Sequence, residues 1–101
     1  MNGTQNLTTE IATTIRAIWT NRAEAGYTGD WLPLHALRAR IASYEDVTWT
    51  RKEIATALAH LLATHQARLA PETNRKTLTT ADHDAAIWAG GQWLHLISFA
   101  K

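Results

Sequence analysis

The stretch from Thr48 to Pro71 constrains the fold most, because it carries a complete set of signals for one helix. Thr50 is suited to be its N-cap, since its hydroxyl can accept a hydrogen bond from a backbone N–H that the first turn leaves unpaired, and Glu53 can complete a capping box. Apolar side chains then recur mostly at helical spacing, and the alanines between them raise helix propensity. These apolar residues are Ile54, Leu58, Leu61, Leu62 and Leu69. The sequence therefore predicts a helix over 51–66.

Two further helices are predicted upstream. An apolar stripe predicts an amphipathic helix from Leu7 to near Gly26, after a flexible segment over 1–6. The stripe consists of Leu7, Ile11, Ile15, Ile18 and Trp19. Pro33 forbids a long helix from Trp31, so Trp31 and Leu32 are predicted to be extended, with Pro33 at an early helical position. The second helix then runs to about Ser43, with a buried face of Leu34, Leu37 and Ile41.

Downstream of the central helix, two strands are predicted to pair with each other, one over 68–70 that Pro71 ends and one over 93–99. Between them, 78–90 is predicted to be a helix with Thr79 or Thr80 as N-cap, acids at 82 and 84, and Gly90 as a left-handed terminator. The alternative is a strand over 86–89 that turns at Gly90 and Gly91. The helix is preferred, because the cap, the acids and the alanines agree.

Composition bounds the class of protein. A chain of 101 residues supports one domain, placed here over 7–101. The formal net charge of +1 means that binding to nucleic acid would need a local cluster of positive charge. The absence of cysteine excludes disulfides and thiolate metal sites and favours the cytoplasm. No apolar run approaches the roughly 20 residues that span a bilayer, so no membrane partner is expected.

Catalytic and metal-binding patterns are weak in this sequence. There is no cysteine nucleophile, no phosphate-binding glycine loop and no convincing carboxylate pair. His60 and His65 are spaced too far apart for one helical face, and His83 would meet His95 only through tertiary structure. We therefore expect no enzyme activity, no cofactor and no metal site.

The predicted order of helix, strand, helix, helix, strand, insertion and strand resembles the winged helix-turn-helix family over nearly the whole chain. The resemblance is carried by Trp31-Leu32, Leu34, Leu37, Ile41, Glu53-Ile54, Leu58, Leu61, Arg68 to Pro71, and Leu94 to Phe99. It implies a mainly α fold with a small antiparallel β-sheet, and the segment from Pro71 to Gly91 departs from the family by inserting a helix in the wing. The stretch over 74–98 is also similar to the tails of small actinobacterial and actinophage proteins.

The resemblance implies a DNA-binding transcriptional regulator that inserts the helix over 51–66 into the major groove of double-stranded DNA. Residues at matching positions become candidate contacts of three kinds. Those in the groove are Thr48, Arg51, Lys52 and Thr56, those on phosphates through the wing are Asn74, Arg75 and Lys76, and those on the backbone are Arg38 and Arg40. A homodimer through the first helix is a further expectation.

The same basic residues have a plainer interpretation as solvated surface. Arg51 and Lys52 lie in a first helical turn, where the dipole favours acids, which indicates another use for them. The segment over 74–76 can equally be an exposed loop. Acids near the central helix, Glu45, Asp46 and Glu53, would repel phosphates.

The five tryptophans raise a second hypothesis. Trp19, Trp31 and Trp49 are expected in the core. Trp88 and Trp93 bracket the glycine pair and are expected to be partly exposed, which suits a protein contact; the alternative is that they pack on the first helix. The alternative function is thus a protein-interaction module of winged-helix fold, such as a phage protein that binds a host factor.

Overall fold

The computed structural model describes residues 3–72, 76 and 78–99 and contains four α-helices and two small antiparallel sheets in that part of the chain. The helices are α1 (Gly3–Thr20), the 3-10 turn η1 (Arg22–Ala25), α2 (Leu34–Ala42), α3 (Arg51–Ala63) and α4 (Thr80–Ala85). The strands are β1 (Leu32–Pro33), β2 (Ala67–Ala70), β3 (Ile87–Ala89), β4 (Gln92–Leu94) and β5 (Leu96–Phe99). The predicted class, mainly helical with a small antiparallel sheet, is confirmed.

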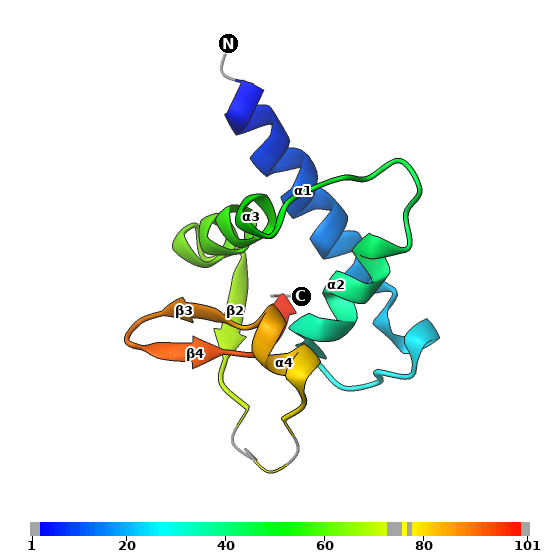
Figure 1. Ribbon diagram of the computed structural model, residues 1–101, viewed down its shortest axis with the longest axis vertical. Coiled ribbons are helices and arrows are strands. Elements are labelled where there is room, and N and C mark those ends of the chain that lie inside the picture. Colours follow the sequence, from blue (N-terminus) through cyan, green and yellow to red (C-terminus); the bar gives the residue numbers. More distant parts are fainter. Residues whose placement is uncertain (1–2, 73–75, 77, 100–101) are drawn as a thin grey trace.

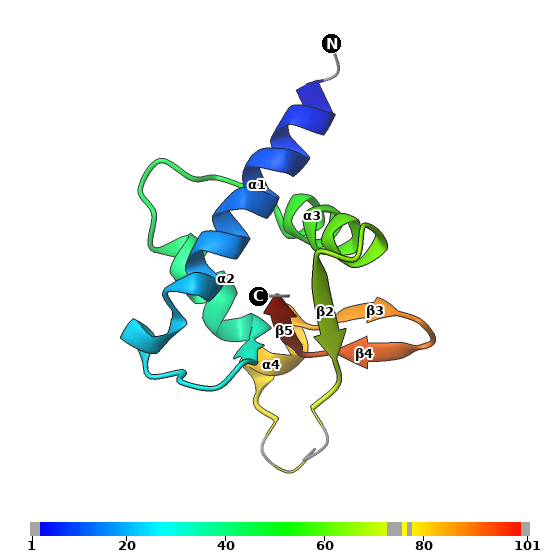
Figure 2. The same ribbon diagram turned by 180° about the vertical axis from the view of Figure 1, so that it is seen from behind.

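Helix α1 packs on α3, α2 and β5 and supplies one side of the core, as Figures 1 and 2 show from opposite sides. Its predicted stripe is confirmed, because Ile11, Ile15 and Ile18 are all buried. The helix begins at Gly3, earlier than the predicted start, and ends at Thr20. The chain then continues as η1 and is closed by Gly26, whose φ of +94° suits glycine.

The larger sheet has the strand order β1-β5-β2, with the last described strand in the centre. Ile97 of β5 lies opposite Leu32 on one side and Leu69 on the other, so three apolar side chains share the inner face. The predicted pairing between 68–70 and the C-terminal strand is confirmed.

The prediction of one continuous strand over 93–99 is wrong, because the chain changes sheets at His95. Its backbone N–H donates to the Ala70 carbonyl at 2.9 Å, and its carbonyl accepts from the Leu34 N–H at 2.8 Å. Both backbone groups of His95 are thus bound to neighbouring segments, while β4 pairs with β3 as a separate hairpin.

The helix preferred over 78–90 is correct only in its first half. Thr79 is the N-cap as predicted, but α4 ends at Ala85, and Ala86 is extended with a ψ of 148°. Ile87–Ala89 form the alternative strand, and Gly90 and Gly91 have φ values of +62° and +79°. Two successive positive φ angles define the type I′ turn that joins tightly paired strands.

The start of α2 and the end of α3 both differ from the prediction. Pro33 is an extended N-cap (φ −61°, ψ 138°) and not a helical residue, because it pairs with β5. Helix α3 ends at Ala63 and not at residue 66, because His65 adopts a left-handed φ of +59°. The His65 and Gln66 N–H groups then bond back to carbonyls of the last turn, which satisfies them.

Two of the three tryptophans expected in the core lie there. Trp19 is buried and donates from Nε1 to the Asp30 carbonyl at 2.9 Å, and Trp49 packs half-buried on the core. The prediction for Trp31 is wrong, since it is 38% exposed. Leu32 occupies the inward position, so its extended neighbour points outward, where the Arg68 guanidinium lies 5.7 Å from the Trp31 ring centroid.

Candidate functional site

The start of α3 is organised by a capping box. The Thr50 hydroxyl accepts from the Glu53 N–H at 3.1 Å, and the Thr50 N–H donates to Glu53 Oε1 at 2.8 Å. The N-cap and the box are as predicted. Glu53 is therefore turned back to the helix terminus, where its charge is favourable to the dipole.

Helix α3 presents a polar face opposite its buried one. Ile54, Ala57, Leu58 and Leu61 face the core, whereas Arg51, Lys52, Thr56 and His60 are exposed. Within the part of the chain that the structure describes, neither Arg51 nor Lys52 makes an ion pair. The Thr56 hydroxyl donates to the Lys52 carbonyl at 2.9 Å, so it remains able to accept from outside.

Lys52 and Thr56 lie together beside the first turns of α1. They border a shallow hollow of about 180 Å³ whose other lining residues include Leu7, Thr8 and Ile11. The structure thus brings these two predicted DNA contacts onto one side of α3.

Arg51 lies on a different side of the same helix. It lines a groove with Arg38 of α2, whose Nη1 donates to the Asp84 carbonyl at 3.3 Å. Successive residues on a helix are about 100° apart, so Arg51 and Lys52 serve different surfaces despite being neighbours in sequence.

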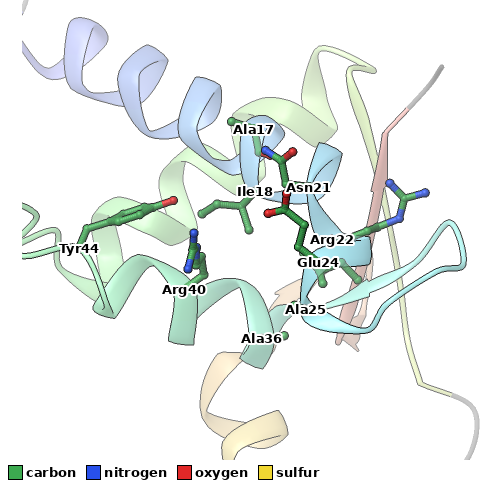
Figure 3. Close-up of a pocket in the computed structure, with 10 residues that line it drawn as sticks. Ala17, Ile18, Asn21, Arg22, Glu24, Ala25, Ala36, Arg40 and Tyr44 are labelled. Carbon is green, nitrogen blue, oxygen red and sulfur yellow. The ribbon is translucent and has the colours of Figure 1, made fainter.

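The other predicted DNA contacts lie apart from the pair Lys52 and Thr56 and from the pair Arg51 and Arg38. Arg40 lines a separate cavity of about 290 Å³ between α1, η1 and α2, and its guanidinium lies 5.6 Å from the Tyr44 ring centroid (Figure 3). Thr48 is exposed in the loop before α3, and Lys76 is exposed in the connection after β2. Asn74 and Arg75 lie outside the described residues. Glu45 and Asp46 are exposed in the loop that leads to α3.

Trp88 and Trp93 form a cross-strand pair on the β3–β4 hairpin. Their ring centroids are 5.3 Å apart in an edge-to-face arrangement, and the residues are 59% and 52% exposed. Neither belongs to the set of side chains packed on the core. Ile87 and Leu94, the neighbouring cross-strand pair, are half-buried and buried, so the hairpin alternates as a two-faced ribbon.

The hairpin forms one wall of a groove that the sequence pattern did not predict. Figures 1 and 2 show the hairpin projecting on the same side of the molecule as α3, below that helix. The groove between them measures about 300 Å³. The signal in the sequence is the stretch over 85–94, which contains two tryptophans and no charged residue.

Two of the histidines contact residues that are distant in the sequence. His95 is buried, and its Nδ1 accepts from the Glu72 N–H at 3.1 Å, while His35 Nε2 lies 3.5 Å from Asp82 Oδ1. Across the described ranges, no group of three or more histidine, aspartate or glutamate side chains is placed to hold a metal ion. Among the helices described here, none combines the length and the apolar character that crossing a membrane requires.

Comparison of the chain with models of protein families, with curated proteins and with solved structures found no match. The geometry of α3 and of the hairpin is therefore the basis for assigning a function.

Proposed function

We propose that this chain is a DNA-binding protein of the winged helix-turn-helix type, acting as a transcriptional regulator that inserts α3 into the major groove. The observation that carries the proposal is the start of α3, where Arg51 and Lys52 are exposed and, among the described residues, form no ion pair. Cations at this end of a helix oppose its dipole. A DNA phosphate beside either side chain would supply the negative charge that pairs with it.

The arrangement of the elements supports the same proposal. Helices α2 and α3 follow each other, and the strands that flank them pair in the order β1-β5-β2. The order α1, β1, α2, α3, β2 and β5 is the one on which the family resemblance rests. In this proposal α4 and the β3–β4 hairpin are an insertion in the wing.

The capping box holds one acid beside the proposed DNA contact. Glu53 lies in the first turn of α3, and its carboxylate accepts from the Thr50 N–H at the helix terminus. Glu45 and Asp46 remain exposed nearby, so the proposed contact is local and not a broad basic surface.

A homodimer through α1 remains part of the proposal. Its apolar stripe is packed within the chain, so such a dimer would use the outer face of α1.

Replacing Lys52 by glutamate tests this proposal. We expect Lys52→Glu to weaken binding to double-stranded DNA and to reduce the slope of log affinity against log salt concentration by about 1. The measurement is fluorescence anisotropy over a salt series, with random duplex and with DNA from upstream of the protein's own gene.

The control is Thr28→Glu, which also adds a carboxylate, at an exposed position of the loop before β1. It should leave the affinity nearly unchanged, and neither variant should alter thermal unfolding appreciably, since both sites are exposed. Equal affinity of wild type and Lys52→Glu, or absence of binding even at low salt, would rule out insertion of α3.

A second candidate function is a protein-interaction module of the same fold. The observation that favours it is the exposure of Trp88 and Trp93, 59% and 52%, on a hairpin without charged residues. Large exposed aromatic side chains are typical of contact sites between proteins.

A further inference from the structure

We propose that the groove between α3 and the β3–β4 hairpin docks an apolar segment of another protein that carries a carboxylate side chain. We call it the α3–hairpin groove and define it by Arg38, Arg51, Ala55, Ala59, Trp88 and Trp93. This inference rests on the second candidate function above and does not depend on DNA binding.

Both walls of the α3–hairpin groove are largely apolar. The hairpin wall consists of uncharged residues from 85 to 94, and the facing wall of α3 adds Ile54, Ala55 and Leu58. Trp88 and Trp93 leave much of their surface in water, and covering such surface is favourable in proportion to its area. An apolar occupant is therefore favoured over a phosphate backbone at this wall.

The groove also has room for an occupant. Ala55 and Ala59 on α3, with Ala89 on the hairpin, line it with small side chains. They leave a hollow of about 300 Å³, at the lower end of the roughly 300–1,000 Å³ typical of binding pockets. A hollow of this size suits one or two anchoring side chains of a short segment.

The charged residues of the groove indicate which polar group its occupant should carry. Among the described lining residues, Arg38 and Arg51 carry the charges, and both are positive. Arg51 is exposed and has no ion pair in the described part of the chain, while Arg38 donates only to a main-chain carbonyl, that of Asp84. A carboxylate beside the apolar anchor would pair with one of these two guanidinium groups and so orient the segment.

The experiment is a selection of random short peptides displayed on phage against the purified, immobilised protein. We expect the selected peptides to combine an aromatic or aliphatic anchor with an aspartate or glutamate. Synthetic copies of the most enriched peptide are then measured by fluorescence anisotropy against wild type and variants. Ala59→Phe fills the groove and should weaken peptide binding by about tenfold or more. The variant Arg51→Glu should bind more tightly to a version of the peptide in which lysine replaces the acidic residue.

Ala63→Phe is the matched control, because it adds the same side chain to an exposed position of α3 that does not line the groove. It should bind as wild type does. Trp93→Ala should independently weaken binding of the peptide, because it removes part of one wall of the groove. Lys52→Glu should retain peptide binding, which separates this proposal from the proposed contact with DNA.

Three outcomes would overturn the inference. The first is a set of selected peptides with no enrichment of acidic residues, and the second is binding that survives Ala59→Phe. The third is self-association in sedimentation experiments that Ala59→Phe abolishes and Ala63→Phe does not, which would assign the groove to a second copy of this chain.

Discussion

At Ser98, the central strand β5 places a hydroxyl group in the interior, where the residue is 1% exposed. Among the described side-chain nitrogen and oxygen atoms, its Oγ is the buried one without a hydrogen-bond partner. Arg68 lies opposite Ser98 in the sheet, and its guanidinium is stacked on Trp31. Because side chains alternate along a strand, Ser98 lies on the face of β5 opposite to Ile97, and it is buried there.

Replacing Ser98 by alanine should stabilise the protein. An unsatisfied buried polar group costs about 1–3 kcal/mol, so Ser98→Ala should raise the free energy of unfolding by about 1 kcal/mol. Urea denaturation measures this change. Ser43→Ala is the comparison, because the Ser43 hydroxyl donates to the Arg40 carbonyl at 2.6 Å and its loss should bring no gain. A lower midpoint for Ser98→Ala would mean that the hydroxyl has a partner in solution.

At the scale of elements, α4 depends on its cap. The helix has only 6 residues, and the Thr79 hydroxyl accepts from the Asp82 N–H at 3.2 Å while Asp82 Oδ2 accepts from the Thr79 N–H at 2.8 Å. Burial raises the pKa of the Asp82 carboxyl. The hydrogen bonds from Thr79, together with the neighbouring His35, outweigh this effect and hold that pKa below its ordinary value of 3.8. The capping box therefore favours the ionised form of Asp82.

Asp82→Asn should lower the melting temperature near neutral pH. Because the folded pKa of Asp82 is below its unfolded value, the stabilisation is complete above 3.8 and disappears as the pH falls through the folded value. The difference in melting temperature between wild type and Asp82→Asn should accordingly shrink below pH 3.8. Thermal unfolding followed by circular dichroism at several pH values measures this. A difference that persists unchanged in acid would assign the effect to packing instead of charge.

The starts of α3 and α4 were predictable from the sequence, and several element ends were not. Thr50 and Thr79 act through residues three positions away, so a local pattern identifies both caps. After α3 ends at Ala63, the chain turns at His65, a left-handed residue that is not glycine, and such residues are too uncommon for the sequence to mark this one. The strand Ile87–Ala89 forms because its partner follows a type I′ turn and because Ile87 packs on the core, and this packing is decided by the tertiary structure.

At the scale of the whole molecule, all the large elements share one core. Residues from α1, α2, α3 and the larger sheet form a single hydrophobic cluster, with Ala85 of α4 included. Ile15, at 0% exposed, lies on α1, which packs on α3. Loss of packing at Ile15 should therefore destabilise the entire domain.

Ile15→Ala should cost about 2–5 kcal/mol of unfolding free energy, because it leaves a cavity in a shared core. Unfolding should remain a single cooperative transition when followed by tryptophan fluorescence and by circular dichroism. Thr13→Ala, on the exposed face of the same helix, should change stability by less than about 0.5 kcal/mol. Separate transitions for the two probes would contradict a single shared core.

The candidate site was predictable only in part, because the grouping of its residues depends on the arrangement of the whole molecule. The sequence placed Arg51, Lys52 and Thr56 on the central helix, and all three are exposed there. It could not show that Arg51 faces the hairpin with Arg38, or that Arg40 belongs to another cavity, since both depend on how the helices cross. The exposure of Trp88 and Trp93 followed from the glycine turn between them, whereas the groove beside them needed the tertiary structure.

The position of β5 has a consequence for synthesis on the ribosome. Strands β1 and β2 do not pair with each other, since each finds its partner in β5, the last described strand of the sequence. While β5 is still inside the exit tunnel, Leu32 and Leu69 lack the neighbour that covers them, and α2 lacks the His95 carbonyl that accepts from its first N–H. The nascent chain can form its helices early, because their contacts are local. The sheet must wait until the C-terminal strand has emerged, and until then the apolar faces that it will cover remain open to chaperones and to aggregation.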